Sequence, residues 1–168
     1  MARVREAGMG DIILILSAAV FVVALLDAAW GDLRALRIRN RVPLALLAAF
    51  VPAALAGGLS GEDWLLHLGT GMACFVVAAI LFSLGVWGGG DAKLVPAVTL
   101  WLGPAALPRF LLVMAVVGGL VALAALVRRR AEAGSLRPAL RTHVPYGIAI
   151  AAGGLDWAAL SLLPRLTG

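Results

Sequence analysis

The chain has 168 residues, a length that suits a single domain. Its composition excludes a soluble globular protein, because 62% of the residues are hydrophobic and only 14% are charged. The mean hydropathy is +1.02, and several apolar runs are long enough to cross a bilayer, which predicts an all-α integral membrane bundle. The net charge of +5 does not indicate nucleic-acid binding, because the basic residues cluster in short loops beside apolar runs.

Six membrane-spanning helices are predicted within one transmembrane domain over residues 1–168. The start of the chain is similar to a signal peptide, with Arg3 and Arg5 before an apolar run. We expect this segment to be kept as the first span, because removing it would leave five spans. The expected spans are 11–30, 42–59, 64–87, 94–107, 110–127 and 144–163.

Local signals mark several ends of these spans. Gly57 and Gly58 are expected to end the second span, and Ser60 with Asp63 resembles a capping box for the third. The turn between the fourth and fifth spans is expected at Pro108–Arg109. Glycines 103, 153 and 154, with Pro96, Pro104 and Asp156, are expected to interrupt the fourth and sixth spans.

The loops after the first, third and fifth spans carry most of the lysines and arginines. These loops are expected at 31–41, around Lys93 and at 128–141. Short basic loops remain in the cytoplasm, so this distribution predicts both termini outside the cytoplasm. The loop arginines are also expected to contact anionic lipid headgroups of the bilayer.

Cys74 is the only cysteine, and it lies within an apolar run. A single cysteine excludes an internal disulfide and a cysteine-based zinc cluster. Cys74 is therefore interpreted as a small apolar residue, and neither a metal nor a cofactor is expected.

Two aspartates are the candidate functional residues. Asp91 follows three glycines in the segment from Trp87 to Lys93 (WGGGDAK), between two apolar stretches. A carboxylate in such a setting is costly unless it faces protein or water, and glycines let the backbone leave helical geometry and approach a bound peptide. Asp32 follows the first span, so both acids are expected at the cytoplasmic boundary.

A pair of aspartates can hydrolyse a peptide bond. One carboxylate takes a proton from water while the other, protonated, polarises the carbonyl. Two carboxyls within about 3 Å do not both ionise readily, so their apparent pKa values separate. We therefore predict Asp32 and Asp91 as a catalytic pair.

Other interpretations of these acids remain open. Asp32 can balance Arg34 or Arg37, and Asp91 can cap a helix or pair with Lys93. The chain would then be a non-enzymatic assembly or transport subunit.

Asp27 is a further acidic residue of the first span. It lies about 140° around the helix from Asp32 and about 7.5 Å deeper in the membrane, so it is a supporting acid or a partner for an arginine or a backbone group. His67 and Asp156 are expected to have no chemical role, and no motif supports a lipid-modifying enzyme.

The motifs resemble those of type IV prepilin peptidases. The segment from Asp32 to Asn40 (DLRALRIRN) is similar to their D-x-R-x-x-x-I-P-N motif, and Gly88 to Lys93 (GGGDAK) matches G-x-G-D-x-K. The segment from Val144 to Gly147 (VPYG) resembles the V-P-Y-G motif of the short family members that serve Tad/Flp-type pili. Arg39 stands where the family usually has proline.

The resemblance implies a GxGD aspartic endopeptidase of the bacterial inner membrane. It would cut the basic leader from prepilins or pseudopilins at the cytoplasmic side, or another signal-anchored peptide. Larger members also N-methylate the product and have a four-cysteine zinc motif, neither of which is expected here. By position, the resemblance makes Asp32 and Asp91 the catalytic pair, with supporting roles for Gly88, Gly90, Lys93, Asn40 and Asp27.

Overall fold

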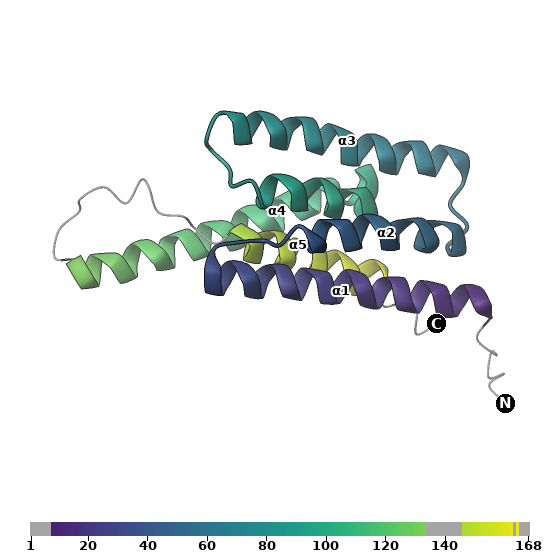
Figure 1. Cartoon of the computed structure of the whole chain (residues 1–168), viewed down its shortest axis with the longest axis horizontal. Helices are drawn as coiled ribbons and strands as arrows, with labels where there is room; N and C mark the ends of the chain where they lie inside the picture. The colour runs from purple at the N-terminus through teal and green to yellow at the C-terminus, as the bar shows by residue number, and fades with distance from the viewer. Residues whose placement is uncertain (1–7, 134–145, 163, 165–168) are drawn as a thin grey trace.

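The computed structural model describes residues 8–133, 146–162 and 164. This part of the chain is all-α, as predicted, and contains five helices without a strand (Figure 1). The basic loop expected at 128–141 lies largely outside the described residues, as do Arg3, Arg5, Val144 and Pro145. The helices are α1 (Met9–Ala35), α2 (Arg41–Ala56), α3 (Gly61–Ser83), α4 (Asp91–Ala133) and α5 (Tyr146–Ser161).

The helix ends between α2 and α3 follow the sequence signals. The cap of α2 is Gly57, and Gly58 then adopts a φ of +68° that favours glycine. The Asp63 N–H donates to Ser60 Oγ at 3.1 Å, and the Ser60 N–H donates to Asp63 Oδ2 at 3.2 Å. The predicted capping box is therefore confirmed.

Helix α1 is longer than the sequence predicts. It continues past the expected end at Trp30 as far as Ala35, and it closes on Leu36, which has a φ of 49° and donates its N–H to the Asp32 carbonyl. The prediction that Asp32 lies in a loop after the first span is therefore wrong. Asp32 belongs to the last turn of α1, where the helix fixes the direction of its side chain.

The expected interruption of the last span is also wrong. Helix α5 continues through Gly153 and Gly154 without a break. A Cβ on Gly153 would lie 2.7 Å from the Phe110 ring, and a Cβ on Gly154 would lie 2.6 Å from Leu25 Cδ1. The two glycines let α4 and α1 approach α5 closely, so they serve packing between helices.

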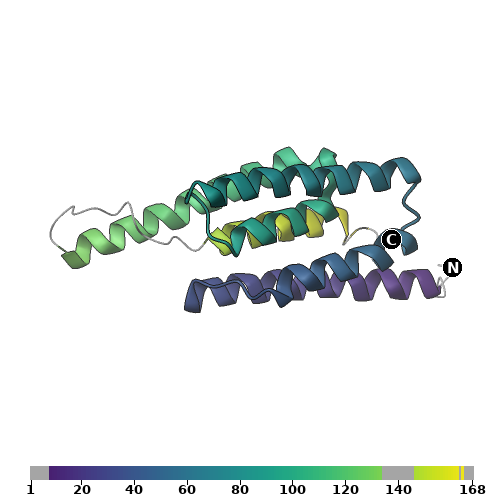
Figure 2. The same cartoon turned by 45° about the horizontal axis from the view of Figure 1, so that its top comes forward.

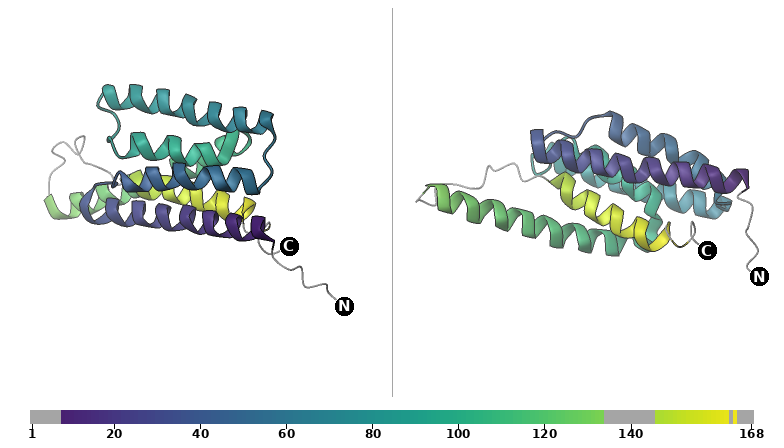
Figure 3. Two further views of the ribbon diagram at one scale, coloured as in Figure 1. Left: turned by 45° about the vertical axis from the view of Figure 1, so that its right-hand side comes forward. Right: turned by 90° about the horizontal axis from the view of Figure 1, so that it is seen from below.

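Helix α4 consists of two arms that meet at Gly103. This residue has a non-helical φ of 66° and ψ of −178°, so the direction changes before the expected turn at Pro108. Figure 3 shows the second arm returning beside α5. The next residue, Pro104, has no N–H to donate to the Leu100 carbonyl. His67 replaces this missing hydrogen-bond partner, because its Nδ1 lies 2.7 Å from the Leu100 oxygen.

The helices have the length and apolarity of a membrane protein. Three of them could cross a bilayer by these criteria, over Met9–Ala35, Gly61–Ser83 and Asp91–Val127. Helix α3 buries only Thr70, Gly71 and Ala78 and exposes large apolar side chains on its other faces, as expected for contact with lipid. The number of spans stays a prediction. Exposed apolar residues of α3 include Leu65, Met72, Phe75, Val76 and Ile80.

Aromatic side chains join the helices at the centre of the core. The rings of Phe21 on α1 and Trp101 on α4 are 4.8 Å apart, and Phe50 on α2 is 5.9 Å from Trp101. Trp101 also donates its indole N–H to the Leu46 carbonyl at 2.9 Å, so its one polar atom is satisfied. Figure 2 shows α1 and α2 side by side, with the first arm of α4 and α5 between this pair and α3. This packing holds the ends of α1, α4 and α5 together.

Candidate active site

Three helix ends that carry the predicted motifs lie at one end of the bundle. Figure 1 shows the end of α1 and the starts of α4 and α5 on the left, opposite the start of α1. Asp32 and Asp91 are therefore at the same end, although they are far apart in the sequence. The segments that carry them are in contact, because a Cβ on Gly90, next to Asp91, would lie 3.0 Å from the Ile38 Cβ.

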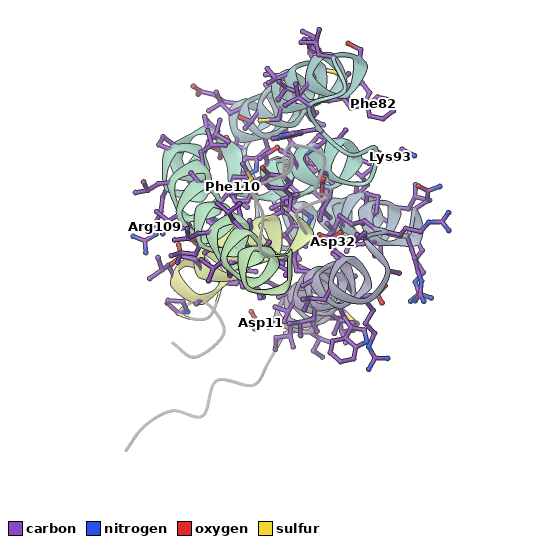
Figure 4. All side chains as sticks on the ribbon, turned by 90° about the vertical axis from the view of Figure 1, so that its left-hand side faces the viewer. Asp11, Asp32, Phe82, Lys93, Arg109 and Phe110 are labelled. Atoms are coloured by element: carbon purple, nitrogen blue, oxygen red, sulfur yellow. The ribbon has the colours of Figure 1, made fainter. Side chains whose placement is uncertain are left out.

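Asp32 is held between α1 and α5. Asp32 is only 6% exposed. Its Oδ2 accepts a hydrogen bond from the Gly147 N–H at 2.6 Å. Figure 4, which views the bundle from this end, labels Asp32 near the middle of the helices. A Cβ on Gly147 would lie 2.8 Å from Oδ2 and 2.9 Å from the Asp32 Cβ. Only glycine at this position lets the start of α5 donate to the carboxyl.

Asp91 is the first residue of α4. The glycines just before it lie close to other side chains. A Cβ on Gly88 would lie 3.1 Å from Asp91 Oδ2, and a Cβ on Gly90 would lie 3.0 Å from the Ile38 Cβ. In the segment between α3 and α4, the residue with a positive φ is Gly85, at +69°. The glycines beside Asp91 therefore matter here for the space they leave, rather than for a left-handed backbone.

The ion pairs of the described residues involve neither candidate catalytic aspartate. They join Asp27 to Arg39 and Arg41, and Asp156 to Arg109. Arg34, which the alternative interpretation pairs with Asp32, lies 4.1 Å above the Trp30 ring. The described contacts therefore give the two acids no simple charge-balancing role.

Lys93 and Asn40 bond to each other. Lys93 Nζ donates to Asn40 Oδ1 at 3.2 Å, and Lys93 points outward in Figure 4. Asn40 occupies the N-cap position of α2, but its side chain makes no capping hydrogen bond. The Asn40 side chain therefore links the starts of α2 and α4 and does not cap α2.

Asp27 is a partner for arginines, as one of the two interpretations predicts. Arg41 donates to both of its carboxylate oxygens at 3.0 to 3.2 Å. Arg39 Nη1 lies 3.7 Å from Oδ1. These contacts hold the segment after α1 against that helix.

Within residues 8–133, 146–162 and 164, no group of three or more His, Cys, Asp or Glu side chains could hold a metal ion.

A cavity of about 230 Å³ adjoins Asp91. Its walls come from the segment before α4, from the first and second arms of α4, and from the start of α5. Apart from the carboxyl group of Asp91, the hydroxyl group of Tyr146 and the indole N–H of Trp87, the lining side chains are apolar. The lining residues are Trp87, Asp91, Met114, Ala115, Gly118, Gly119, Ala122, Tyr146 and Ile150.

Sequence reasoning missed several residues that shape this site. Gly147 is present in the last motif, but its hydrogen bond to Asp32 could not be read from the spacing. Ile38 is part of the first motif, and its contact with Gly90 gave no sequence signal. Gly118 and Gly119 lie in an apolar run that looks like any other membrane span.

The comparison with protein families gives one match. The type IV leader peptidase family matches residues 19–123, a range that includes both aspartates and ends before α5. No curated protein and no solved structure matches the chain significantly. The family match covers more than half of the chain and agrees with the two aspartate motifs. The chain therefore belongs to the type IV leader peptidase family.

Proposed function

We propose that the protein is a membrane aspartic endopeptidase that removes the leader of type IV prepilins or pseudopilins of the Flp/Tad kind. In this proposal Asp32 and Asp91 activate the water that attacks the scissile peptide bond. Gly88, Gly90, Lys93, Asn40 and Asp27 support the geometry of the pair, and no cofactor takes part.

The observation that supports the proposal is the placement of Asp32, in the last turn of α1, and Asp91, at the start of α4, at the same end of the bundle. The two motifs also contact each other, because a Cβ on Gly90, next to Asp91, would lie 3.0 Å from the Cβ of Ile38, in the segment that begins with Asp32. Neither acid takes part in the ion pairs of the described residues. Membership of a leader peptidase family supports a hydrolytic use of the pair.

The two carboxyl groups divide the work of peptide hydrolysis. The ionised carboxylate takes a proton from water while the water oxygen bonds to the carbonyl carbon. The protonated carboxyl donates a hydrogen bond to the oxyanion that develops on the carbonyl oxygen. When the C–N bond breaks, a proton passes to the leaving nitrogen, and new carboxyl and amino termini are released.

The position of the pair suits a substrate anchored in the membrane. The apolar helix of a prepilin lies in the bilayer beside the enzyme, while its basic leader stays in the cytoplasm. Basic residues in the segment after α1 favour a cytoplasmic location for this end of the bundle. The substrate backbone becomes extended at the glycine-rich turn, where main-chain groups can pair with it.

Replacement of each aspartate tests this proposal. Asp32→Asn and Asp91→Asn are expressed separately in membranes with a prepilin, and leader removal is followed as a shift in substrate mass. Each variant is expected to lose at least about 10³-fold in rate, because the remaining carboxyl group cannot replace both proton-transfer roles.

Glu62→Gln is the matched control. It also removes one carboxylate, but Glu62 lies in the first turn of α3, at the opposite end from Asp91. The control is expected to cleave the prepilin at the wild-type rate. Full processing by both aspartate variants would exclude the peptidase mechanism and favour a non-enzymatic assembly role.

A further inference from the structure

A groove of about 580 Å³ runs between α2 and α3, over the first arm of α4. Both helices pack on α4 but have few contacts with each other, and the groove lies where those contacts are missing. Much of its wall is made of exposed apolar side chains, so the groove is open to the surroundings of the bundle, which are lipid in a membrane. These exposed wall residues are Leu44, Leu47, Leu68, Met72 and Phe75.

Aromatic rings close the groove at the end far from the aspartates. The ring of Phe50 on α2 lies 5.4 Å from the Trp64 ring and 5.8 Å from the His67 ring, both on α3. The lining stops at Leu47 on α2 and at Leu68 on α3, just before these rings. The groove is therefore a slot with one closed end, and its other end lies at the start of α4.

Lys93 and Asn40 form the polar end of the groove, and the other lining residues are apolar. Lys93 Nζ donates to Asn40 Oδ1 at 3.2 Å. This bond uses the acceptor of the amide and leaves its N–H groups, and the rest of the ammonium group, as donors. Both residues are exposed, and Figure 4 shows Lys93 pointing outward. A positive charge beside N–H donors is the chemistry that binds a phosphate group.

We propose that this groove binds an anionic phospholipid, with the phosphate at Lys93 and Asn40 and an acyl chain between α2 and α3. Basic pockets between membrane helices are binding sites for anionic lipid headgroups. From Lys93 to Leu100 the floor of the groove extends for roughly 10 Å along α4. This is most of the depth of one leaflet, since the whole hydrocarbon core is about 30 Å thick. The bound chain supplies the dispersion contacts that α2 and α3 do not make with each other.

The charge at the open end favours a lipid over the prepilin as the occupant. The leader of the proposed substrate is basic, so Lys93 repels it, whereas the same charge attracts a phosphate group. The groove also touches neither aspartate. The inference goes beyond the proposed peptidase function and does not depend on it, because lipid binding is measured without cleavage.

Lipid binding to the full-length protein tests the inference. The purified protein in detergent is titrated with phosphatidylglycerol, or with phosphatidylcholine that has the same acyl chains, and bound lipid is counted by native mass spectrometry. The wild type is expected to bind phosphatidylglycerol at least about fivefold more tightly, which is the preference that one basic residue near a headgroup supplies. Lys93→Gln is expected to lose this preference, and Lys93→Arg, which restores the charge, is expected to keep it.

Arg37→Gln is the control for charge. It removes one positive charge from an exposed residue that does not line the groove, and it is expected to keep the preference for phosphatidylglycerol. A preference that falls equally in Arg37→Gln and Lys93→Gln would show general attraction to a basic surface and would overturn the site.

Leu68→Trp tests the part of the groove that would hold the acyl chain. The larger ring takes space between α2 and α3, so phosphatidylglycerol binding is expected to weaken by at least about threefold. Leu65→Trp is the control, because Leu65 is an exposed residue of α3 outside the groove lining, and it is expected to bind lipid as the wild type does.

The outcomes separate the possible occupants. Equal wild-type affinity for the two lipids, or a preference that survives Lys93→Gln, would overturn the inference. Displacement of phosphatidylglycerol by an uncleaved prepilin would assign the groove to the substrate. If Leu68→Trp changes the number of protein copies per particle but not the bound lipid, the groove is an interface between copies. None of these results changes the expected loss of cleavage in Asp32→Asn, so the peptidase proposal is tested separately.

Discussion

Gly90 packs so closely against Ile38 that a Cβ on the glycine would lie 3.0 Å from the Ile38 Cβ. Ile38 belongs to the segment that begins with Asp32, and Gly90 directly precedes Asp91. The contact therefore connects the two aspartate motifs at the residues beside the acids. We interpret it as one of the contacts that set the separation of the two carboxyl groups.

Adding a methyl group at Gly90 should push the motifs apart. Gly90→Ala is expected to lower prepilin cleavage by about tenfold to hundredfold, because displacements near 1 Å have costs of this size in active sites. Cleavage kinetics in membranes measure the effect. Gly89→Ala is the control, because its Cβ would meet only the end of the Phe82 ring, at 3.2 Å, and this exposed ring can move away.

The double variant Gly90→Ala/Ile38→Gly tests the cause of that loss. Removing the Ile38 side chain together with its Cβ makes room for the new methyl group, so the double variant is expected to recover part of the activity. A double-mutant cycle measures this coupling. If the two losses simply add, the contact does not set the spacing of the motifs.

Gly147 should tolerate no side chain. In Gly147→Ala, the new methyl group would lie within 3 Å of the Asp32 Oδ2 and Cβ. The Cβ is fixed by α1 and cannot rotate away. We expect at least about a hundredfold loss of cleavage, together with a destabilisation of about 1–3 kcal/mol from overpacking. Cleavage assays and unfolding in detergent check the two effects, and wild-type cleavage would remove the start of α5 from the site.

The Asp27–Arg41 pair should affect activity more than stability. Arg41 is 66% exposed and Asp27 is 28% exposed, and exposed pairs contribute only about 0–1 kcal/mol. Arg41→Gln is therefore expected to change unfolding little but to slow cleavage several-fold, because it loosens the segment that carries Ile38. Arg109→Gln, which breaks the Arg109–Asp156 pair, is the control and should leave cleavage unchanged.

His67 should contribute to stability through the Leu100 carbonyl. Because that oxygen only accepts hydrogen bonds, His67 Nδ1 is its donor at 2.7 Å. His67→Phe leaves the carbonyl unpaired and is expected to cost about 1–3 kcal/mol in unfolding free energy. His67→Gln keeps a donor and should cost less. A smaller loss for His67→Phe than for His67→Gln would show that ring packing against Phe50, rather than the hydrogen bond, is what matters.

Much of the fold could be predicted because its signals are local. Apolar runs indicate the helices, and the Ser60–Asp63 capping box identifies the start of α3. The length of α1 could not be predicted, because Arg34 and the other polar residues after Trp30 resemble a loop. The continuous course of α5 was also hidden, since its glycines are retained for contacts with Phe110 and Leu25 on other helices.

The candidate site could be predicted only in its residue types. The motifs identify Asp32 and Asp91, and they predict that both lie at the same depth. They do not contain the hydrogen bond from Gly147 or the contact between Ile38 and Gly90, because both depend on how distant helices pack. The bond between Asn40 and Lys93 likewise joins two helix starts that are far apart in the sequence.

The break at Gly103 leaves the first arm of α4 short. From Asp91 to Gly103 a helix rises by roughly 18 Å, whereas the hydrocarbon core of a bilayer is about 30 Å thick. If its far end is level with one membrane surface, this arm does not reach the other surface. The bilayer around the proposed peptidase would then be locally thinner, or a water-filled depression would extend inward to Asp91. Bilayer thickness would thus be a physical variable that sets how readily water reaches the proposed catalytic aspartates.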